Sequence, residues 1–107
     1  MKLPQLVDRF IAAHNNYDSK SFVECFTRSV IVHDEGKTHK GKEEIGKWIE
    51  HSNEEYRSSM KPLKYEETAG TGVLTAEVSG SFPGSPIVLK FHLTLKNDLI
   101  DGLKVTE

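Results

Sequence analysis

The chain of 107 residues carries 14 basic and 16 acidic side chains, for a formal net charge of -2, and 36% of its residues are hydrophobic. This balance predicts one globular domain over residues 1–107 that folds without disulfides or metals, and it excludes an intrinsically disordered chain. Because the charges are mixed and every apolar run is shorter than the roughly 18 residues of a membrane span, we expect neither nucleic-acid nor membrane partners.

Two amphipathic segments predict helices at the start of the chain. Apolar side chains recur every three or four residues from Leu3 to Ile11, and the stripe continues through His14 to Tyr17, which predicts a helix over roughly residues 3–16. Asp18 is a favourable N-cap for a second, shorter helix. The side chains that this helix is expected to bury are Phe22, Val23 and Phe26.

The lone cysteine, Cys25, lies between Glu24 and Phe26 at the expected buried edge of the second helix. With no second cysteine it cannot form an internal disulfide, and its position favours packing over reactive chemistry. The N-terminus has no cationic segment followed by an apolar core, so a reducing cytoplasm is the expected location.

A strand and a longer helix come next. The β-branched run from Ser29 to Asp34 predicts a strand that ends at Gly36. A polar loop then leads to Gly41, which introduces a third helix with two glutamates favourably placed near its N-terminus. One face of that helix is formed by Ile45, Trp48, Ile49, Ser52 and Tyr56.

Beyond Pro62 the apolar period changes from 3.6 to 2, which predicts four strands over roughly residues 63–69, 73–82, 87–96 and 99–106. Short links rich in turn-forming residues favour an antiparallel meander, and no parallel crossover fits between these strands. The order of elements predicts an α+β fold, in which a cone-shaped, curved and mostly antiparallel sheet wraps around the N-terminal helices and the one longer helix.

Three segments, "VDRFIAAHNNYDSKSFVECF", "VIVHDEG" and "GKEEIGKWIE", occur in an order that resembles the nuclear transport factor 2-like superfamily, and within it the SnoaL-like and ketosteroid-isomerase-like branch. The resemblance covers nearly the whole chain and implies a single SnoaL-like domain with a cystatin-like α+β roll around a hydrophobic pocket. It also implies a dimer. Members of the superfamily include isomerases, cyclases, hydrolases, dehydratases and non-enzymatic binding domains, so the resemblance defines fold more closely than activity.

Asp34 is the first candidate for catalysis, because in "VHDEG" it matches the proton-abstracting aspartate of ketosteroid isomerases. Val30, Val32 and Asp34 share one face of the predicted strand, whereas His33 and Glu35 share the other. If the valines line the cone, Asp34 points into it, where desolvation would raise its pKa and favour a role as general base. The alternative is an aspartate that begins a turn and bonds backbone amides.

The resemblance also implies donors for a developing enolate, and here the sequence departs from the family. The tyrosine of the first helix corresponds to Phe10, and the supporting tyrosine of the third helix corresponds to Ile49. The later acid falls near residues 91–93, and only one of the possible registers puts His92 there. Alternation argues against that register, because it places His92 opposite the apolar set of its strand. His14, one turn beyond Phe10, could act as a substitute donor, or it could be a partly exposed structural histidine. Steroid isomerisation by the family mechanism is therefore not expected.

Aromatic and apolar side chains are expected to form the pocket wall, which in this fold nearly coincides with the core. The candidates for ligand binding are Phe10, Tyr17, Phe26, Val32, Trp48, Ile49, Tyr56, Phe91 and His92. No metal site is expected, because His33, Asp34 and His39 form the only local group of ligands and adjacent residues point in opposite directions. No glycine-rich phosphate loop opens a helix, and no cofactor is expected.

Two functional hypotheses remain open, and the sequence does not decide whether the chain is an enzyme. In the first, a SnoaL-like protein binds a small hydrophobic molecule in an apolar pocket, and Asp34 acts as general base in isomerase or cyclase-type chemistry, with His14 as a second catalytic candidate. In the second, the chain is a non-catalytic ligand-binding or dimeric association domain. Uncharged side chains on the expected outer face of the sheet, such as Val73 and Thr75, favour a homodimer through the sheet under both hypotheses.

Overall fold

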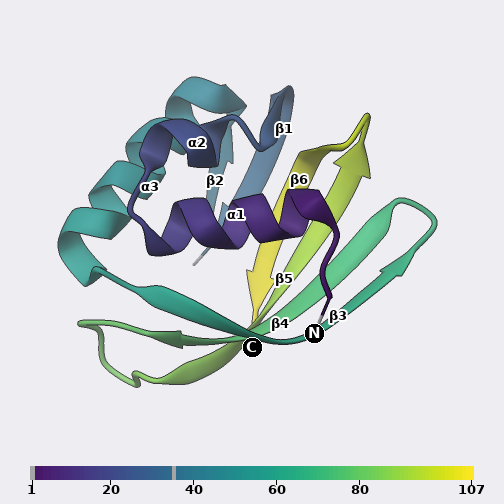
Figure 1. Ribbon diagram of the computed structural model, residues 1–107. Helices are drawn as coiled ribbons and strands as arrows, with labels where there is room; N and C mark the ends of the chain where they lie inside the picture. The colour runs from purple at the N-terminus through teal and green to yellow at the C-terminus, as the bar shows by residue number, and fades with distance from the viewer. Residues whose placement is uncertain (1, 35) are drawn as a thin grey trace.

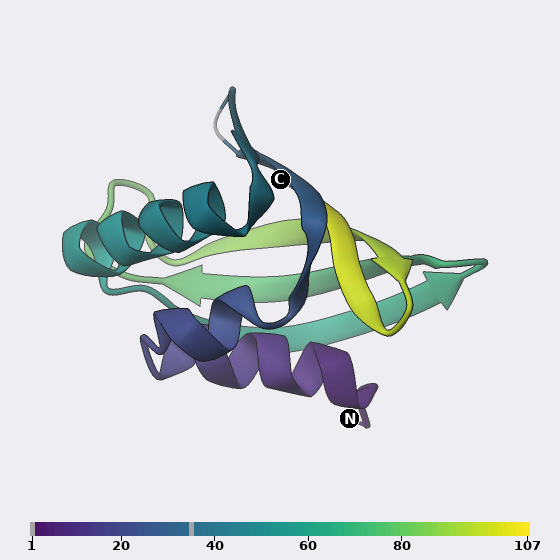
Figure 2. The ribbon, with the colours of Figure 1, turned by 90° about the horizontal axis from the view of Figure 1, so that it is seen from above.

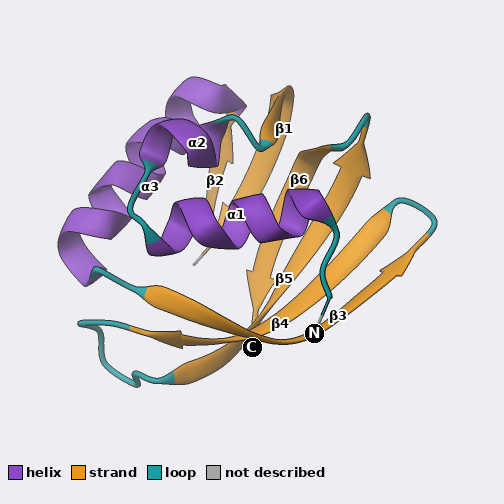
Figure 3. Cartoon of the chain, in the orientation of Figure 1, coloured by secondary structure: helices purple, strands orange, loops and turns teal. Residues whose placement is uncertain are grey.

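The computed structural model describes residues 2–34 and 36–107 and has the predicted α+β arrangement, with helices on the concave side of a curved sheet (Figures 1 and 3). The six-stranded sheet has the order β2-β1-β6-β5-β4-β3. Its elements are α1 (Gln5–Asn15), α2 (Ser19–Val23), β1 (Phe26–Asp34), β2 (Lys37–Lys40), α3 (Gly41–Tyr56), β3 (Ser59–Thr68), β4 (Thr71–Ser79), β5 (Ile87–Lys96) and β6 (Leu99–Thr106).

The antiparallel meander from β3 to β6 is confirmed, but β1 adds a parallel pair to the sheet. Val32 pairs with Leu103 and His33 with Lys104, so β1 and β6 run side by side in the same direction (Figure 2). The other edge of β1 pairs with β2, in a segment that the sequence predicted as a polar loop. Glu35, which was predicted to point away from the cone, lies outside the described residues.

Several predicted boundaries are wrong, among them the end of α2 and the start of β3. Helix α2 ends at Val23, so Phe26 begins β1 and does not belong to the helix. Strand β3 begins at Ser59 and passes through Pro62, before which the sequence indicated no strand. The register shifts between Pro62 and Lys64, and such an irregularity in an edge strand accommodates a residue that has no N–H to donate. The predicted cap is confirmed, since Asp18 accepts a hydrogen bond from the Ser21 amide.

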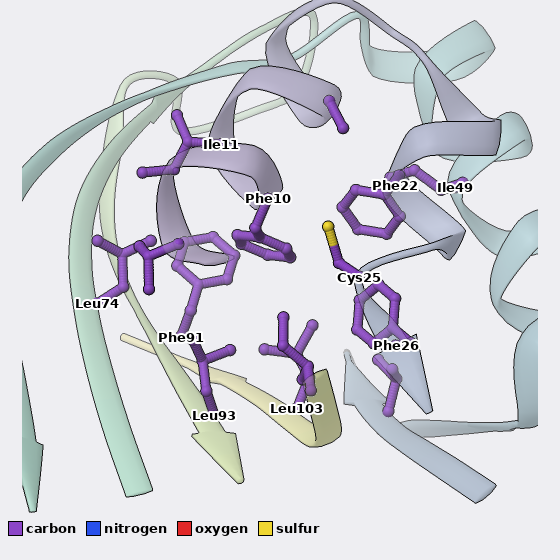
Figure 4. Packing of buried hydrophobic residues seen from close by; sticks show 14 of the residues in the cluster. Phe10, Ile11, Phe22, Cys25, Phe26, Ile49, Leu74, Phe91, Leu93 and Leu103 are labelled. Atoms are coloured by element: carbon purple, nitrogen blue, oxygen red, sulfur yellow. The ribbon is translucent and has the colours of Figure 1, made fainter. Parts of the chain in front are cut away.

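The core is organised around a group of phenylalanines contributed by helices and sheet. Phe10 of α1 points between Phe22 of α2 and Phe91 of β5, with ring centroids 5.3 and 6.2 Å away (Figure 4). Phe22 in turn lies 5.2 Å from Phe26 of β1. Cys25 is buried in the same cluster, where burial raises the pKa of its thiol and keeps it protonated. These contacts fix both N-terminal helices against the concave face of the sheet.

The end of α1 is also tied to the start of β3 by a side-chain amide. Asn15 accepts a hydrogen bond from the Met60 amide at 2.8 Å and donates one to the Met60 carbonyl at 3.0 Å. These two bonds hold residues that are 45 positions apart in the sequence. Among the described residues, no helix combines the length and the apolar character that crossing a bilayer requires.

Replacing Phe26 tests whether the aromatic cluster holds the helices in place. Phe26 is fully buried, so Phe26→Ala should lower the free energy of unfolding by about 3–5 kcal/mol through lost apolar contact and a residual cavity. Urea denaturation followed by circular dichroism measures the change. Leu63→Ala, at a side chain that is 45% exposed, is the control and should change stability by less than about 0.5 kcal/mol.

Candidate functional site

A cavity of about 470 Å³ lies between the helices and the concave face of the sheet. All three helices contribute to its wall, together with the ends of β1 and β6, parts of β3, β4 and β5, and two links. The lining residues are Phe10, His14, Phe22, Asp34, Trp48, Ile49, Ser52, Tyr56, Ser58, Met60, Val78, Phe82, Pro83, Ile87, Leu89, Phe91, Leu103, Val105, Thr106 and Glu107. Aromatic and aliphatic side chains predominate, as in sites that bind compact organic molecules.

The ionisable groups of the described wall are few, and none is a lysine or an arginine. Two carboxylates, Asp34 and Glu107, line the cavity together with the imidazole of His14, and no lysine or arginine is among the described lining residues. An anionic ligand would therefore face two acids with no cation to pair with. The charge of the wall favours neutral or cationic ligands.

Asp34 reaches the cavity because of its position in β1. Val30 and Val32 are fully buried, and two residues further along the same face Asp34 is half-buried and lines the cavity. His33, on the opposite face, is exposed and lies 3.2 Å from the Thr38 hydroxyl of β2. The strand alternation that the sequence indicated thus directs one acid into the hollow and the neighbouring histidine outward.

His14 and Ser58 form a buried polar pair in this largely apolar wall. His14 lies one residue before the end of α1, Ser58 lies in the link between α3 and β3, and the His14 Nε2 and Ser58 Oγ atoms are 3.3 Å apart. Their exposed fractions are 9% and 7%. Burial lowers the pKa of His14 to about 4, so the imidazole is neutral near pH 7 and can offer one donor and one acceptor.

The predicted wall residues separate into two groups. Phe10, Trp48, Ile49, Tyr56 and Phe91 line the cavity, as do both catalytic candidates, Asp34 and His14.

The other predicted wall residues lie outside the lining. Phe26 and Val32 are fully buried in the core. Tyr17 lies on the surface and donates a hydrogen bond to the Arg57 carbonyl. His92 lies on the outer face of the sheet, 2.8 Å from the Thr106 hydroxyl, as its place in the strand alternation predicted.

Sequence reasoning missed Ser58 and the wall formed by Phe82 and Pro83. Ser58 follows a helix with no motif around it, and its burial depends on α1 and on the end of β4, both distant in sequence. The sequence predicts a strand over residues 73–82, but β4 ends at Ser79 and Phe82 lies in the link between β4 and β5. A hydrophobic residue in a short polar link was the available signal for this part of the wall.

Trp48, the single tryptophan, lines the cavity and stacks on His39 of β2 with ring centroids 5.4 Å apart. Its indole is therefore a built-in fluorescence probe of the cavity. No group of three or more side chains that could hold a metal ion occurs in residues 2–34 and 36–107.

The fold is shared with solved structures of the nuclear transport factor 2-like class. A candidate polyketide cyclase from Sinorhizobium meliloti is 30% identical over 97% of this chain and 95% of its own, with a TM-score of 0.93. A protein with a ketosteroid isomerase-like fold from Catenulispora acidiphila, solved in complex with trimethylamine, is 17% identical over 99% and 87%, with a TM-score of 0.88. A protein of unknown function from Cytophaga hutchinsonii with a nuclear transport factor 2-like fold is 18% identical over 99% and 93%, with a TM-score of 0.81.

The amino-acid sequence identifies the family of the chain. Residues 7–102 match the SnoaL-like domain, and the chain belongs to this family. No curated protein matched the sequence. The predicted membership in the SnoaL-like, nuclear transport factor 2-like superfamily is confirmed.

The buried imidazole predicts a specific pH dependence of stability. Because the pKa of His14 falls from 6.5 in the unfolded chain to about 4 in the fold, the unfolded state binds more protons between these values. The contribution of the neutral His14 side chain to the free energy of unfolding is complete above pH 6.5. It falls by about 3 kcal/mol as the pH approaches 4.

Urea denaturation at pH 7 and pH 4 of the wild-type protein and of His14→Gln measures this contribution. Between pH 7 and pH 4 the wild-type protein should lose about 3 kcal/mol more unfolding free energy than His14→Gln does. His33→Gln removes an exposed histidine and should follow the wild type. An equal pH dependence in wild type and His14→Gln would contradict the burial of a neutral imidazole.

Proposed function

We propose that the chain binds a compact, largely apolar and neutral molecule in the cavity, and that Asp34 acts on it as a general base in isomerase or cyclase-type proton transfer. The observation that supports this proposal is the place of Asp34, a half-buried carboxylate in the wall of a hollow of about 470 Å³ whose other lining is mostly apolar. A carboxylate in this position can accept a proton from a carbon acid that is held in the hollow.

The proposed step is removal of a proton from a carbon next to a carbonyl. The C–H bond breaks, the proton passes to an Asp34 carboxylate oxygen, and the electron pair moves into an enolate. An isomerase returns the proton to another carbon. In a cyclase the enolate carbon forms a C–C bond to a second carbonyl of the same molecule, whose π bond breaks, and the resulting alkoxide takes the proton from Asp34. The similarity to the candidate polyketide cyclase of Sinorhizobium meliloti supports this reaction class.

Steroid isomerisation by the mechanism of ketosteroid isomerases is not part of the proposal. Phe10 and Ile49 line the cavity, and the family resemblance assigns to these two positions the tyrosines of that mechanism. Neither side chain can donate a hydrogen bond, so stabilisation of an enolate must come from other groups of this wall.

Hydrogen exchange into a simple ketone tests the role of Asp34. Cyclohexanone incubated with the protein in deuterated buffer should lose its α-protons faster than in buffer alone, followed by proton NMR. Asp34→Asn should lower the protein-dependent rate by about 100-fold or more, because the amide cannot accept the proton.

The control for this experiment is Asp8→Asn, which makes the same change at an exposed residue of α1 and should retain the rate. Binding is measured separately through Trp48 fluorescence. Exchange that persists in Asp34→Asn rules out this carboxylate as the base, and binding without exchange in the wild type leaves a ligand-binding domain.

We also propose that two copies of the chain associate through the outer face of the sheet. Such a dimer is compatible with catalysis and with ligand binding alone. Val88 of β5 and Ile31 of β1 are 45% and 39% exposed, and Val73 and Thr75 of β4 are half-buried. These side chains share the face with Glu77 and Lys90, which pair across the strands with Val88 and Thr75. Apolar and charged groups side by side can form the centre and the rim of an interface.

Light scattering tests the association. The wild-type protein is expected to have twice the mass of one chain, and Val88→Glu should shift it toward the monomer by placing a charge in the interface. Ala12→Glu places the same charge on the exposed face of α1 and should leave the mass unchanged. A monomeric wild type would contradict the proposal.

A further inference from the structure

The polar pair of His14 and Ser58 has hydrogen-bonding capacity that its own contact does not use. A neutral imidazole and a hydroxyl together carry two hydrogens that can be donated, and the bond between Nε2 and Oγ uses one of them. Among the described residues neither side chain has another hydrogen-bond partner. In either tautomer of His14, one donor remains for a third group.

The tautomer that donates from Nε2 leaves the Ser58 hydroxyl hydrogen available. The imidazole is held in the core, with its ring centroid 6.3 Å from that of Phe22, whereas a hydroxyl hydrogen turns freely about the Cβ–Oγ bond. Ser58 can therefore accept from His14 and donate toward the cavity that both residues line. While the Ser58 oxygen accepts from His14 at 3.3 Å, its hydrogen can turn toward the cavity.

The backbone around Ser58 is fixed from two sides. Two residues further along the chain, Met60 is held by both hydrogen bonds of the Asn15 amide. On the other side Gly80 packs so closely that a Cβ there would lie 3.0 Å from the Ser58 Cα and 2.8 Å from the Tyr56 carbonyl. A hydroxyl on such a rigid support keeps its position without a ligand, as a preorganised donor requires.

We infer that the Ser58 hydroxyl, oriented by the His14 imidazole, donates a hydrogen bond to a carbonyl oxygen of the ligand. The inference rests on the proposed function and narrows its ligand to neutral molecules that carry a ketone-type oxygen on an apolar body. When Asp34 removes a proton from the adjacent carbon, negative charge collects on that oxygen, and the bond from Ser58 strengthens. Ser58 then supplies the donor that Phe10 and Ile49 cannot.

A pair of nearly isosteric ligands separates hydrogen bonding from packing. Cyclohexanone carries an oxygen where methylenecyclohexane carries a CH₂ group. In Ser58→Ala the dissociation constant of cyclohexanone, measured by Trp48 fluorescence, should rise roughly two- to tenfold, while that of methylenecyclohexane stays unchanged. Ser52→Ala removes a hydroxyl from another serine of the same wall and should affect both ligands equally.

The carbonyl stretching frequency of bound cyclohexanone gives a second measurement that a merely structural serine would not change. In infrared difference spectra against the ¹³C-labelled ketone, the band should lie at lower frequency in the wild type than in Ser58→Ala, and His14→Gln should give an intermediate or heterogeneous band. The wild-type position should persist in Ser52→Ala and in Asp34→Asn.

The outcomes for Ser58 and Asp34 are distinguishable. A ketone whose band shifts in Ser58→Ala but that shows no α-proton exchange would support the Ser58 donor and contradict catalysis by Asp34. Exchange that depends on Asp34, with the same carbonyl band in wild type and Ser58→Ala, would overturn the inference and leave the proposed function standing. Failure of cyclohexanone to bind, or equal losses for both ligands in Ser58→Ala, would also overturn it.

Discussion

The parallel pairing of β1 with β6 is the constraint on which the site depends. It joins the N-terminal helices and the β1–β2 hairpin to the C-terminal meander, and it places the end of β1 beside the end of β6. Asp34 lines the cavity through this alignment, since its strand continues past Val32, which is paired with Leu103. Without the pair, the concave face would lose the side that carries the acid, and the helices would have only the meander to pack against.

Much of the fold could be predicted because its signals are local. The stripe of α1, the Asp18 cap and the alternation of β4 and β5 are each determined by residues a few positions apart. The parallel pair and strand β2 were not predictable in this way. Their partners are chosen by the packing of the whole chain, and Lys37–Lys40 is too short and polar to indicate a strand. The register irregularity near Pro62 likewise allowed β3 to begin earlier than the proline suggested.

The candidate site was predictable where it lies on regular elements. Asp34, Phe10, Trp48, Ile49, Tyr56 and Phe91 follow from periodicity on β1, α1, α3 and β5. The polar pair could not be assembled from the sequence, because His14 and Ser58 are 44 positions apart and Ser58 belongs to a link. Periodicity also could not separate cavity from core. Phe26 and Val32 were candidates for the wall and lie fully in the interior, since both environments select the same side chains.

The wall formed by Phe82 and Pro83 differs from the rest of the lining in its origin, because these residues lie between β4 and β5 while most of the cavity is built on helices and strands. Connecting segments tolerate insertions and deletions far better than paired strands do. A change of length here could lengthen or shorten the hollow while the strand register and the acid at its other side stayed in place. The part of the wall that can adapt to a different ligand is thus separate from the strand that carries the acid, and the two can change independently.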